Sequence, residues 1–349
     1  MDLESLRFTY LRRVVGTALG VLGLDAADRL ARSMARAVHG LNTPMRRRAE
    51  TRLSDALPDN CSTATASRII AAMYEHVGRF CVEALFARRL LREASWRNSI
   101  ALENEASLTA LAAGGRGCLL TTAYLGNPAV AAYALGEIFH PVHVVADRFA
   151  HPVLRAWQDE LVAYRNVRIV DRREATTSLP SILNRGGAVL MIGEHERRRG
   201  PCISVPFLGR TLRCYPTLAR LARWHELPIA VVTCVREARP FTFRLQTHST
   251  IAPPRDEASD AGLMEAIIGA LEHAILRSPE QYLWSLAGGT ANSVAPEWVA
   301  KSGAEPIGTE SGSASCPTRS RTASVWQTPS AAGKAPADRA SPTAPVPTA

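Results

Sequence analysis

The chain has 349 residues, of which 46% are hydrophobic and 21% charged, and its 41 Lys and Arg against 32 Asp and Glu give a formal net charge of +9. This composition is typical of a globular protein and excludes a wholly disordered or fibrous chain. The longest apolar run near the N-terminus, Val14 to Leu24, is shorter than the roughly 20 residues that cross a bilayer as a helix, so we predict no membrane-spanning helix.

Residues 1–95 are predicted to form a helical N-terminal region. A helical pattern runs from Val14 to Val38 and is preceded in the sequence by basic residues. This arrangement fits either a core helix or an in-plane anchor on a membrane surface. Thr43-Pro44 is predicted to supply the N-cap and first residue of a helix that ends before Pro58. Ser62-Thr63 starts the next helix, whose apolar residues from Ile69 to Leu85 recur at helical spacing and are predicted to pack in the core.

Residues 96–298 are predicted to form an α/β domain in which short strands alternate with helices. The predicted strands are Cys118–Thr122, Val142–Ala146, Val167–Val170, Ala188–Ile192, Pro228–Val235 and Phe241–Ile251, the last as an edge strand. The predicted helices are one starting at Asn127-Pro128, then Pro152–Tyr164, Thr177–Leu183, Thr217–Trp224 and Asp256–Leu276. This alternation indicates a central, largely parallel sheet flanked by helices. Such sheets bind ligands beyond the carboxyl ends of their strands, which points to the loops Ala123–Asn127 and Gly193–Pro206.

Residues 299–349 are predicted to be a disordered tail. Ser, Thr, Pro, Ala and Gly dominate this segment, which therefore cannot bury enough apolar surface to offset the entropy lost on ordering. We assign it no site residues.

Cysteine and histidine spacings give no sign of a disulfide framework or a metal centre. The seven cysteines are widely spaced and form no Cys-x-x-Cys pair, which predicts reduced thiols. No His-Glu-x-x-His pairing occurs, and we expect neither a metal nor a cofactor. The basic excess, mostly arginine in clusters such as Arg46-Arg47-Arg48, suits an anionic membrane surface or a phosphorylated substrate. Nucleic acid is not an expected partner, because the chain has no zinc finger, helix-turn-helix or aromatic stacking motif.

Five stretches of the sequence carry a family resemblance in their order and spacing. They are RRRAETRLSDALPD from Arg46 to Asp59, LLTTAYLGNPAV from Leu119 to Val130, LNRGGAVLMIGEH from Leu183 to His195, VPFLGR from Val205 to Arg210, and SPEQYLW from Ser278 to Trp284. Together they resemble the bacterial late acyltransferases of lipid A biosynthesis, the lauroyl/myristoyl transferases, within the wider lysophospholipid acyltransferase superfamily. The fourth and fifth stretches form the strongest pair.

This resemblance implies transfer of an acyl chain to a hydroxyl of a lipid or glycolipid acceptor. The donor would be acyl-CoA or an acyl carrier protein, and the hydroxyl would attack the thioester directly. The resemblance also implies a peripheral or interfacial place on the membrane surface, at the cytoplasmic face of the inner membrane.

The sequence departs from the family at its chemical centre. The family has a His-x4-Asp/Glu pair after the first strand, in which the histidine is the general base and the carboxylate orients its ring. Aligned on Gly126-Asn127, these positions are Tyr124 and Ala129 here. Tyrosine is a weak base near neutral pH, and alanine can orient nothing. The family also continues Trp-x-His-Arg-Arg where this chain has Ser285-Leu286-Ala287-Gly288 after Trp284.

Glu194 and His195 are the candidates for a substitute base. They follow a predicted buried strand, at the position of the family's Asp-Gln. Neighbours in an extended segment point to opposite sides, so we expect only one of the two to face the cleft. The alternative interpretation is a solvated charged loop. For Tyr124 the alternatives are a weak acid/base or substrate-contacting role, and a hydrogen-bonded aromatic ring over a vestigial cleft.

Five further residues are candidates for substrate binding. Gly126 and Asn127 lie on the expected cleft loop, where a glycine permits close approach of a substrate. Arg148 and His151 lie where the resemblance implies a contact loop for the acceptor's phosphate or sugar, and helix capping is the alternative. Arg210 closes the VPFLGR stretch.

Three hypotheses follow from the sequence. The first is an acyltransferase that uses a substitute base. The second is a catalytically inactive family member with a degenerate active site, which binds lipid or acyl chains or partners an active acyltransferase. The third keeps the fold and the cleft but carries out another transfer reaction.

Overall fold

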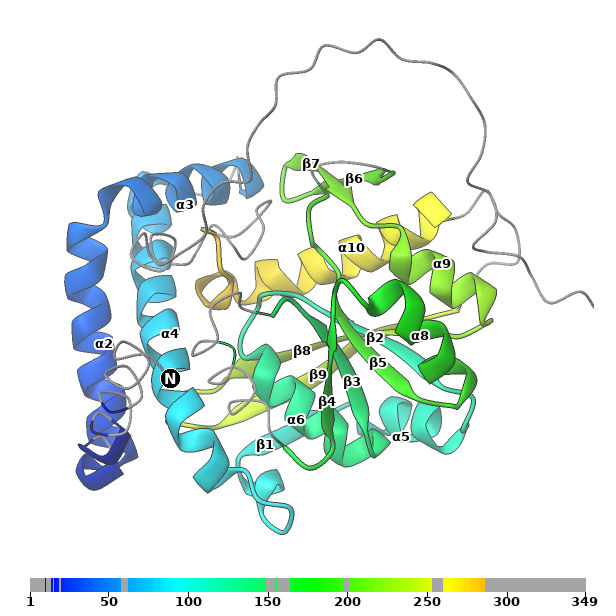
Figure 1. Ribbon diagram of the computed structural model, residues 1–349. Coiled ribbons are helices and arrows are strands. Elements are labelled where there is room, and N and C mark those ends of the chain that lie inside the picture. The colour runs from blue at the N-terminus through cyan, green and yellow to red at the C-terminus, as the bar shows by residue number, and fades with distance from the viewer. Residues whose placement is uncertain are drawn as a thin grey trace, which may run out of the picture. The chain divides into compact units, whose positions relative to one another are not determined.

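The computed structural model describes residues 20–57, 62–148, 164–197, 201–252 and 260–285, with residues 10, 14, 16–18 and 155 (Figure 1). The predicted tail, the predicted helix at Pro152–Tyr164 for the most part, and His151 lie outside the described residues. The domain boundaries at residues 95 and 298 stay a prediction. Within the described part of the chain, no helix combines the length and the apolar character that crossing a bilayer requires.

A seven-stranded mixed sheet forms the centre of the protein, in the order β1-β9-β8-β2-β5-β3-β4. Its strands are β1 (Ile100–Glu103), β2 (Cys118–Thr122), β3 (Val142–Ala146), β4 (Val167–Asp171), β5 (Ala188–Ile192), β8 (Ile229–Arg236) and β9 (Phe243–Ile251). Every neighbouring pair is parallel except β8 and β9. The predicted α/β fold with a largely parallel sheet flanked by helices is therefore confirmed.

Helices cover both faces of the sheet, because the strands are apolar on both sides. Leu119 packs with the core formed by α8 (Ala175–Asn184), α9 (Thr217–Trp224) and α10 (Asp260–Arg277). Its neighbour Leu120 points to the other face and packs with the core under α5 (Glu105–Ala113) and α6 (Pro128–Phe139). All five residues of β2 are buried, as expected of a strand covered on both faces.

Three helices precede the sheet: α2 (Leu24–Leu41), α3 (Thr43–Ala56) and α4 (Thr63–Leu90). In Figure 1, α2 and α4 run side by side and α3 crosses their upper ends. Ser62 caps α4 as predicted, by accepting a hydrogen bond from the Thr65 amide. The predicted cap of α3 is wrong by one residue: Asn42 is the N-cap and accepts from the Met45 amide, so Thr43 is already helical.

Helix α2 is fixed to α4 by small residues and ion pairs on one face only. Gly78 lies against the backbone of Ala31, where an added Cβ would have no room. The buried Asp28 accepts from Arg79 Nε at 2.7 Å. Glu75 accepts from two arginines of α2, each at 2.8 Å. Beside this contact face, α2 leaves large apolar side chains exposed: Leu30, Met34, Val38 and Leu41. Val21 and Leu22, which precede α2, are also exposed.

Two details of the sheet differ from the prediction. Strand β9 is not an edge strand, because the four-residue β1 pairs with it in parallel and forms the edge itself. The predicted loop at Gly193–Pro206 ends in a strand: β6 (Ile203–Phe207) and β7 (Arg210–Cys214) form an antiparallel hairpin. Its turn, Leu208-Gly209, adopts φ values of 51° and 73°, which suit a tight hairpin of this length.

Candidate active site

The carboxyl ends of β2, β3, β4 and β5 meet at one edge of the sheet, because these strands run parallel. The loops that follow them bring together residues far apart in the sequence. Tyr124 follows β2, Asp147 follows β3, Arg172 follows β4, and Glu194 with His195 follows β5. This edge is where ligands bind in open parallel sheets, so both predicted loops contribute to one site.

The PEQYLW stretch holds the Tyr124 loop in place through backbone hydrogen bonds. The Gly126 amide donates to the Gln281 carbonyl at 3.0 Å, and the Leu283 amide donates to the Tyr124 carbonyl at 3.1 Å. Leu125 and Tyr282 form an antiparallel bridge between these two bonds. The segment at residues 281–283 thus acts as a short added strand beside the loop.

The basic helix α3 in turn holds the PEQYLW stretch. Arg52 Nη1 donates to the carbonyls of Trp284 and Ser285, at 3.1 and 3.0 Å. The indole nitrogen of the fully buried Trp284 donates to the Pro279 carbonyl at 2.7 Å. Two stretches separated by more than 200 residues therefore meet through one guanidinium, which the sequence pattern did not predict.

Gly126 and Asn127 shape the backbone of the loop that carries Tyr124. Gly126 has φ 64°, and an added Cβ would overlap the Cys234 carbonyl. Asn127 is the predicted cap of α6, and its Oδ1 accepts from the amides of Ala129 and Val130 at 3.2 and 3.1 Å. Both residues have structural roles in the described geometry.

A buried charge cluster, which the sequence pattern does not predict, lies beside this loop. Glu83 accepts from the Arg236 guanidinium through both carboxylate oxygens and from Asn127 Nδ2 at 2.8 Å. His76 Nδ1 lies 2.5 Å from Arg236 Nη1, and burial together with Arg236 lowers the pKa of His76 well below its ordinary value. The signal in the sequence was a carboxylate at Glu83, within the apolar stripe of a helix.

Tyr124, His195 and Glu194 converge at the centre of the site. The Tyr124 hydroxyl lies 3.3 Å from His195 Nε2, and the two rings meet edge to face with centroids 5.7 Å apart. Glu194 Oε1 accepts the backbone N–H of Tyr124 at 2.6 Å, while its Oε2 is buried without a hydrogen-bond partner among the described residues. The alternative of a solvated loop is wrong for Glu194, which is 4% exposed.

Burial sets the protonation of these three groups. It raises the pKa of the Tyr124 hydroxyl above its ordinary value, and the charges of Glu194 and Asp147 act in the same direction. It lowers the pKa of His195, with a further lowering by Arg172 and an opposing effect of Asp147. It raises the pKa of Glu194 to about 7, against two backbone hydrogen bonds that lower it. Tyr124 is therefore protonated and His195 neutral near pH 7.

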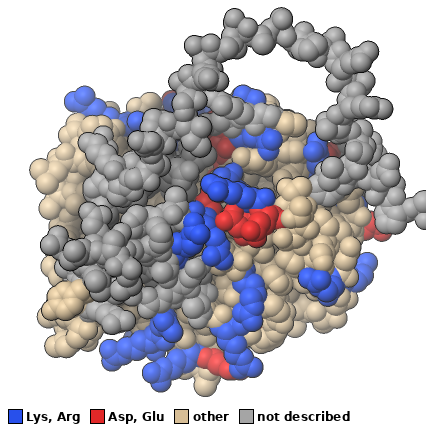
Figure 2. Space-filling model, viewed as in Figure 1, with Lys and Arg blue, Asp and Glu red and all other residues tan. Residues whose placement is uncertain are grey.

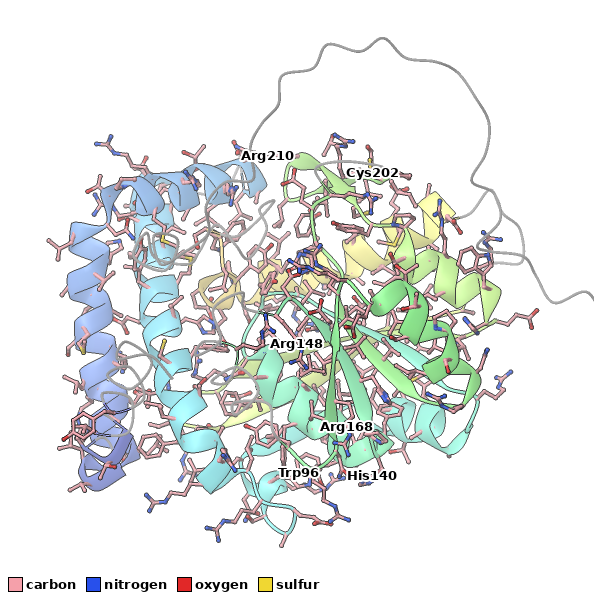
Figure 3. The ribbon with its side chains drawn as sticks, viewed as in Figure 1. Trp96, His140, Arg148, Arg168, Cys202 and Arg210 are labelled. Atoms are coloured by element: carbon pink, nitrogen blue, oxygen red, sulfur yellow. The ribbon has the colours of Figure 1, made fainter. Side chains whose placement is uncertain are left out.

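The remaining predicted site residues do not join this cluster. Arg210 forms an ion pair with Asp55 of α3, at the turn of the hairpin where Gly209 packs on the Asp55 carbonyl. Figure 3 shows Arg148 well apart from Arg210, so the two do not bind one small group together. Ala129 lies in the first turn of α6 and brings no carboxylate to Tyr124.

A cavity of about 320 Å³ opens beside His195. It is lined by His195 and by Val145, Arg172, Arg173, Ala175, Thr176, Met191, Ile192, Gly193, Arg197, Tyr215, Thr217 and Leu218. His195 belongs to this lining, whereas Glu194 and Tyr124 do not. The described residues contain no cluster of three or more His, Cys, Asp or Glu side chains that could hold a metal ion.

Comparison with known families decides the affiliation of the chain. The model of the bacterial lipid A biosynthesis acyltransferases matches residues 3–287, which include the helices α2 to α4, the whole sheet and the PEQYLW stretch. The chain belongs to this family. No curated protein matches the chain.

Membership of this acyltransferase family implies an acyl donor and a lipid acceptor in general terms. The match covers both the loop that carries Tyr124 and the loop that carries His195. The chain therefore belongs to this acyltransferase family over a range that includes Tyr124, Ala129 and His195.

Proposed function

We propose that the protein transfers an acyl chain from a thioester carrier, acyl-CoA or an acyl carrier protein, to a hydroxyl of a lipid or glycolipid, with His195 as the general base. The observation that carries this proposal is the contact between His195 Nε2 and the Tyr124 hydroxyl at 3.3 Å. His195 places an imidazole beside Tyr124, the position at which the family resemblance implies the base. This imidazole lies on the loop after β5, whereas the resemblance implies a base on the loop after β2.

Tyr124 serves in this mechanism as a proton relay. The acceptor hydroxyl gives its proton to the Tyr124 oxygen as Tyr124 gives its own proton to His195 Nε2. The acceptor oxygen then forms a bond to the thioester carbonyl carbon, and the carbon–sulfur bond breaks. The proton on His195 returns through Tyr124 to the departing thiolate, so atoms and charges balance. A protonated tyrosine and a neutral imidazole are the forms that this relay needs.

Glu194 acts as a positioning residue for Tyr124. Its hydrogen bond to the Tyr124 N–H fixes the backbone from which the relay side chain projects. Because the carboxyl group is buried, it is poorly suited to exchange protons with a substrate directly.

The same proposal places the protein on the membrane surface, at the cytoplasmic face of the inner membrane. The exposed apolar face of α2 supports this, since Leu30, Met34 and Val38 follow one another at helical spacing with exposed fractions of 44%, 62% and 48%. Arg46-Arg47-Arg48 at the start of α3 adds positive charge that anionic lipids attract.

Vesicle flotation tests the membrane placement. We expect the protein to float with vesicles that contain anionic lipid, and a Leu30→Ser, Met34→Ser, Val38→Ser variant to remain unbound. A Trp224→Ser variant, which removes an exposed apolar side chain from α9, is the control. Equal flotation of all three proteins would remove α2 from this role.

Acyl transfer is tested by mass spectrometry of lipids from cells with and without the gene, followed by assays of the purified protein with acyl carrier protein and CoA thioesters. We expect an acylated lipid that disappears with the gene and is formed again by the purified protein. Unchanged lipids and no transfer from either donor would reject the proposal.

A second candidate function is supported by Tyr124 and Ala129 at the usual catalytic positions. In this alternative the protein is an inactive family member that binds lipid or acyl chains, or partners an active acyltransferase. The two candidates differ in whether the unmodified protein catalyses transfer.

A further inference from the structure

The cavity beside His195 carries positive charge that the proposed proton relay does not use. Arg172, Arg173 and Arg197 line it, and no Asp or Glu belongs to its described lining. Asp147 accepts from Arg172 Nε at 2.5 Å and balances one of the three charges. In the view of Figure 2, Lys and Arg side chains gather beside acidic ones near the middle of the face that is shown.

The guanidinium groups of two of these arginines lie close to the ring of Tyr215. The Arg197 guanidinium carbon lies 4.6 Å from the ring centroid, and that of Arg172 lies 6.0 Å from it. Arg172 Nη1 also donates to the Tyr215 hydroxyl at 3.1 Å. Stacking on an aromatic face orients a guanidinium and leaves its edge available for a planar, bidentate contact with an oxyanion.

Arg197 has a hydrogen-bond donor that a bound anion could satisfy. Its Nε is buried and has no hydrogen-bond partner among the described residues. A buried, unpartnered donor on a charged group is costly unless a ligand or solvent satisfies it. No carboxylate of the described chain pairs with Arg197, in contrast to Arg172.

Two helix N-termini also contribute to the wall of the cavity. Ala175 and Thr176 belong to the first turn of α8, and Thr217 and Leu218 to the first turn of α9. Neither helix start is capped by a side chain. Uncapped N–H groups and the positive end of the helix dipole favour an anion at such a position.

We propose that this cavity binds a phosphate group of a substrate, held by Arg197 and Arg172 and by the starts of α8 and α9. The inference rests on the proposed function, because His195 lines the same cavity and a phosphate bound there anchors the substrate beside the relay. A volume of about 320 Å³ accommodates a phosphate with part of the group that carries it. The phosphate belongs either to the acceptor's sugar headgroup or to the donor's CoA or phosphopantetheine arm.

Calorimetric titration of the purified full chain with inorganic phosphate tests the site, with sodium chloride at equal ionic strength as the blank. We expect saturable phosphate binding that an Arg197→Gln variant weakens by about ten-fold or more, because a charge-assisted hydrogen bond is lost. Arg197→Lys retains the charge but not the fork of donors, and we expect it to recover only part of the affinity. Arg185→Gln, which removes an exposed guanidinium near the end of α8, is the matched control and should bind as the unmodified protein does.

Two organic probes distinguish the sources of the phosphate. Competition by glucosamine 1-phosphate assigns the cavity to the acceptor, and competition by free coenzyme A assigns it to the donor. Absence of saturable phosphate binding, or equal affinity in the Arg197→Gln and Arg185→Gln variants, overturns the inference.

The result is separable from the fate of the proposed function. Phosphate binding without acyl transfer supports the site and rejects the transferase. Acyl transfer without phosphate binding supports the transferase and rejects the phosphate site.

Discussion

The Glu194 carboxylate and the Tyr124 backbone are joined by a 2.6 Å hydrogen bond that links the loop after β5 to the loop after β2. The second oxygen of the carboxyl group is buried without a partner among the described residues. Burial at this position favours the neutral form of the Glu194 carboxyl group. The same group connects the two loops that carry Tyr124 and His195.

A Glu194→Gln variant is expected to remove a pH dependence of stability. Burial raises the pKa of Glu194 from 4.5 to about 7, so the folded state binds a proton more tightly than the unfolded state. The stabilisation by this proton is complete below pH 4.5 and is lost as the pH rises to about 7. The loss amounts to roughly 3 kcal/mol, since each pKa step is worth about 1.4 kcal/mol. Urea unfolding at pH 5 and pH 8 measures it, and a pH dependence as steep in the Gln variant as in the unmodified protein would assign the effect to other groups.

His195→Ala and Tyr124→Phe are each expected to lower acyl transfer by about 10²–10⁴-fold, the usual contribution of a general base. Because the two residues form one relay, the double variant should be no slower than either single variant. Steady-state rates with the natural donor measure this, with His225→Ala as the control imidazole. Full activity of His195→Ala removes His195 from the mechanism, and additive losses remove the relay.

The rate of the unmodified protein is expected to fall on acidification only below pH 6.5. Burial lowers the pKa of His195 from its ordinary value of 6.5, so the imidazole is still neutral at that pH. A pH–rate profile of kcat/KM gives the inflection directly. An inflection above pH 6.5 that persists in Glu194→Gln would contradict the assignment of the base.

Restoring the family's pair with Tyr124→His and Ala129→Glu separates the two candidate functions. If the unmodified protein is an enzyme, it transfers acyl groups robustly and the double substitution disrupts the relay. If it is an inactive family member, activity arises only in the restored protein. Parallel assays of both proteins under one set of conditions decide between them.

Gly126→Ala is expected to destabilise the protein by more than about 3 kcal/mol, because a Cβ there overlaps the Cys234 carbonyl in addition to the strained backbone. Gly115 is a matched control. Its φ of 63° is close to the 64° of Gly126, but nothing lies within 4 Å of an added Cβ. Gly115→Ala should therefore cost only the backbone strain of about 1 kcal/mol. Chemical unfolding compares the two, and equal losses would show that the close approach to β8 is unimportant.

The candidate site was partly predictable from the sequence. The parallel order of strands implied that the loops after β2 and β5 share an edge, and this placed Tyr124 near His195 in principle. The buried partners of Asn127 were not predictable, because Glu83 and Arg236 lie 153 positions apart and nothing in a local pattern couples them. The sequence predicts that Arg210 binds substrate, whereas the structure pairs Arg210 with Asp55, on a helix that reaches the hairpin only in the folded chain.

The sequence by itself determined the strands β2, β3, β4, β5, β8 and β9, the helix caps at Asn127 and Ser62, and the family of the scaffold, because hydrophobic periodicity and turn residues act over a few neighbouring positions. It did not predict β1 or the hairpin of β6 and β7. The tertiary structure alone decided which polar side chains meet. Parallel strands bring their carboxyl ends together regardless of separation along the chain, and burial there changes the protonation of Glu194, His195 and Tyr124. Such contacts depend on three-dimensional proximity and on the low polarity of the surroundings, neither of which a linear pattern records.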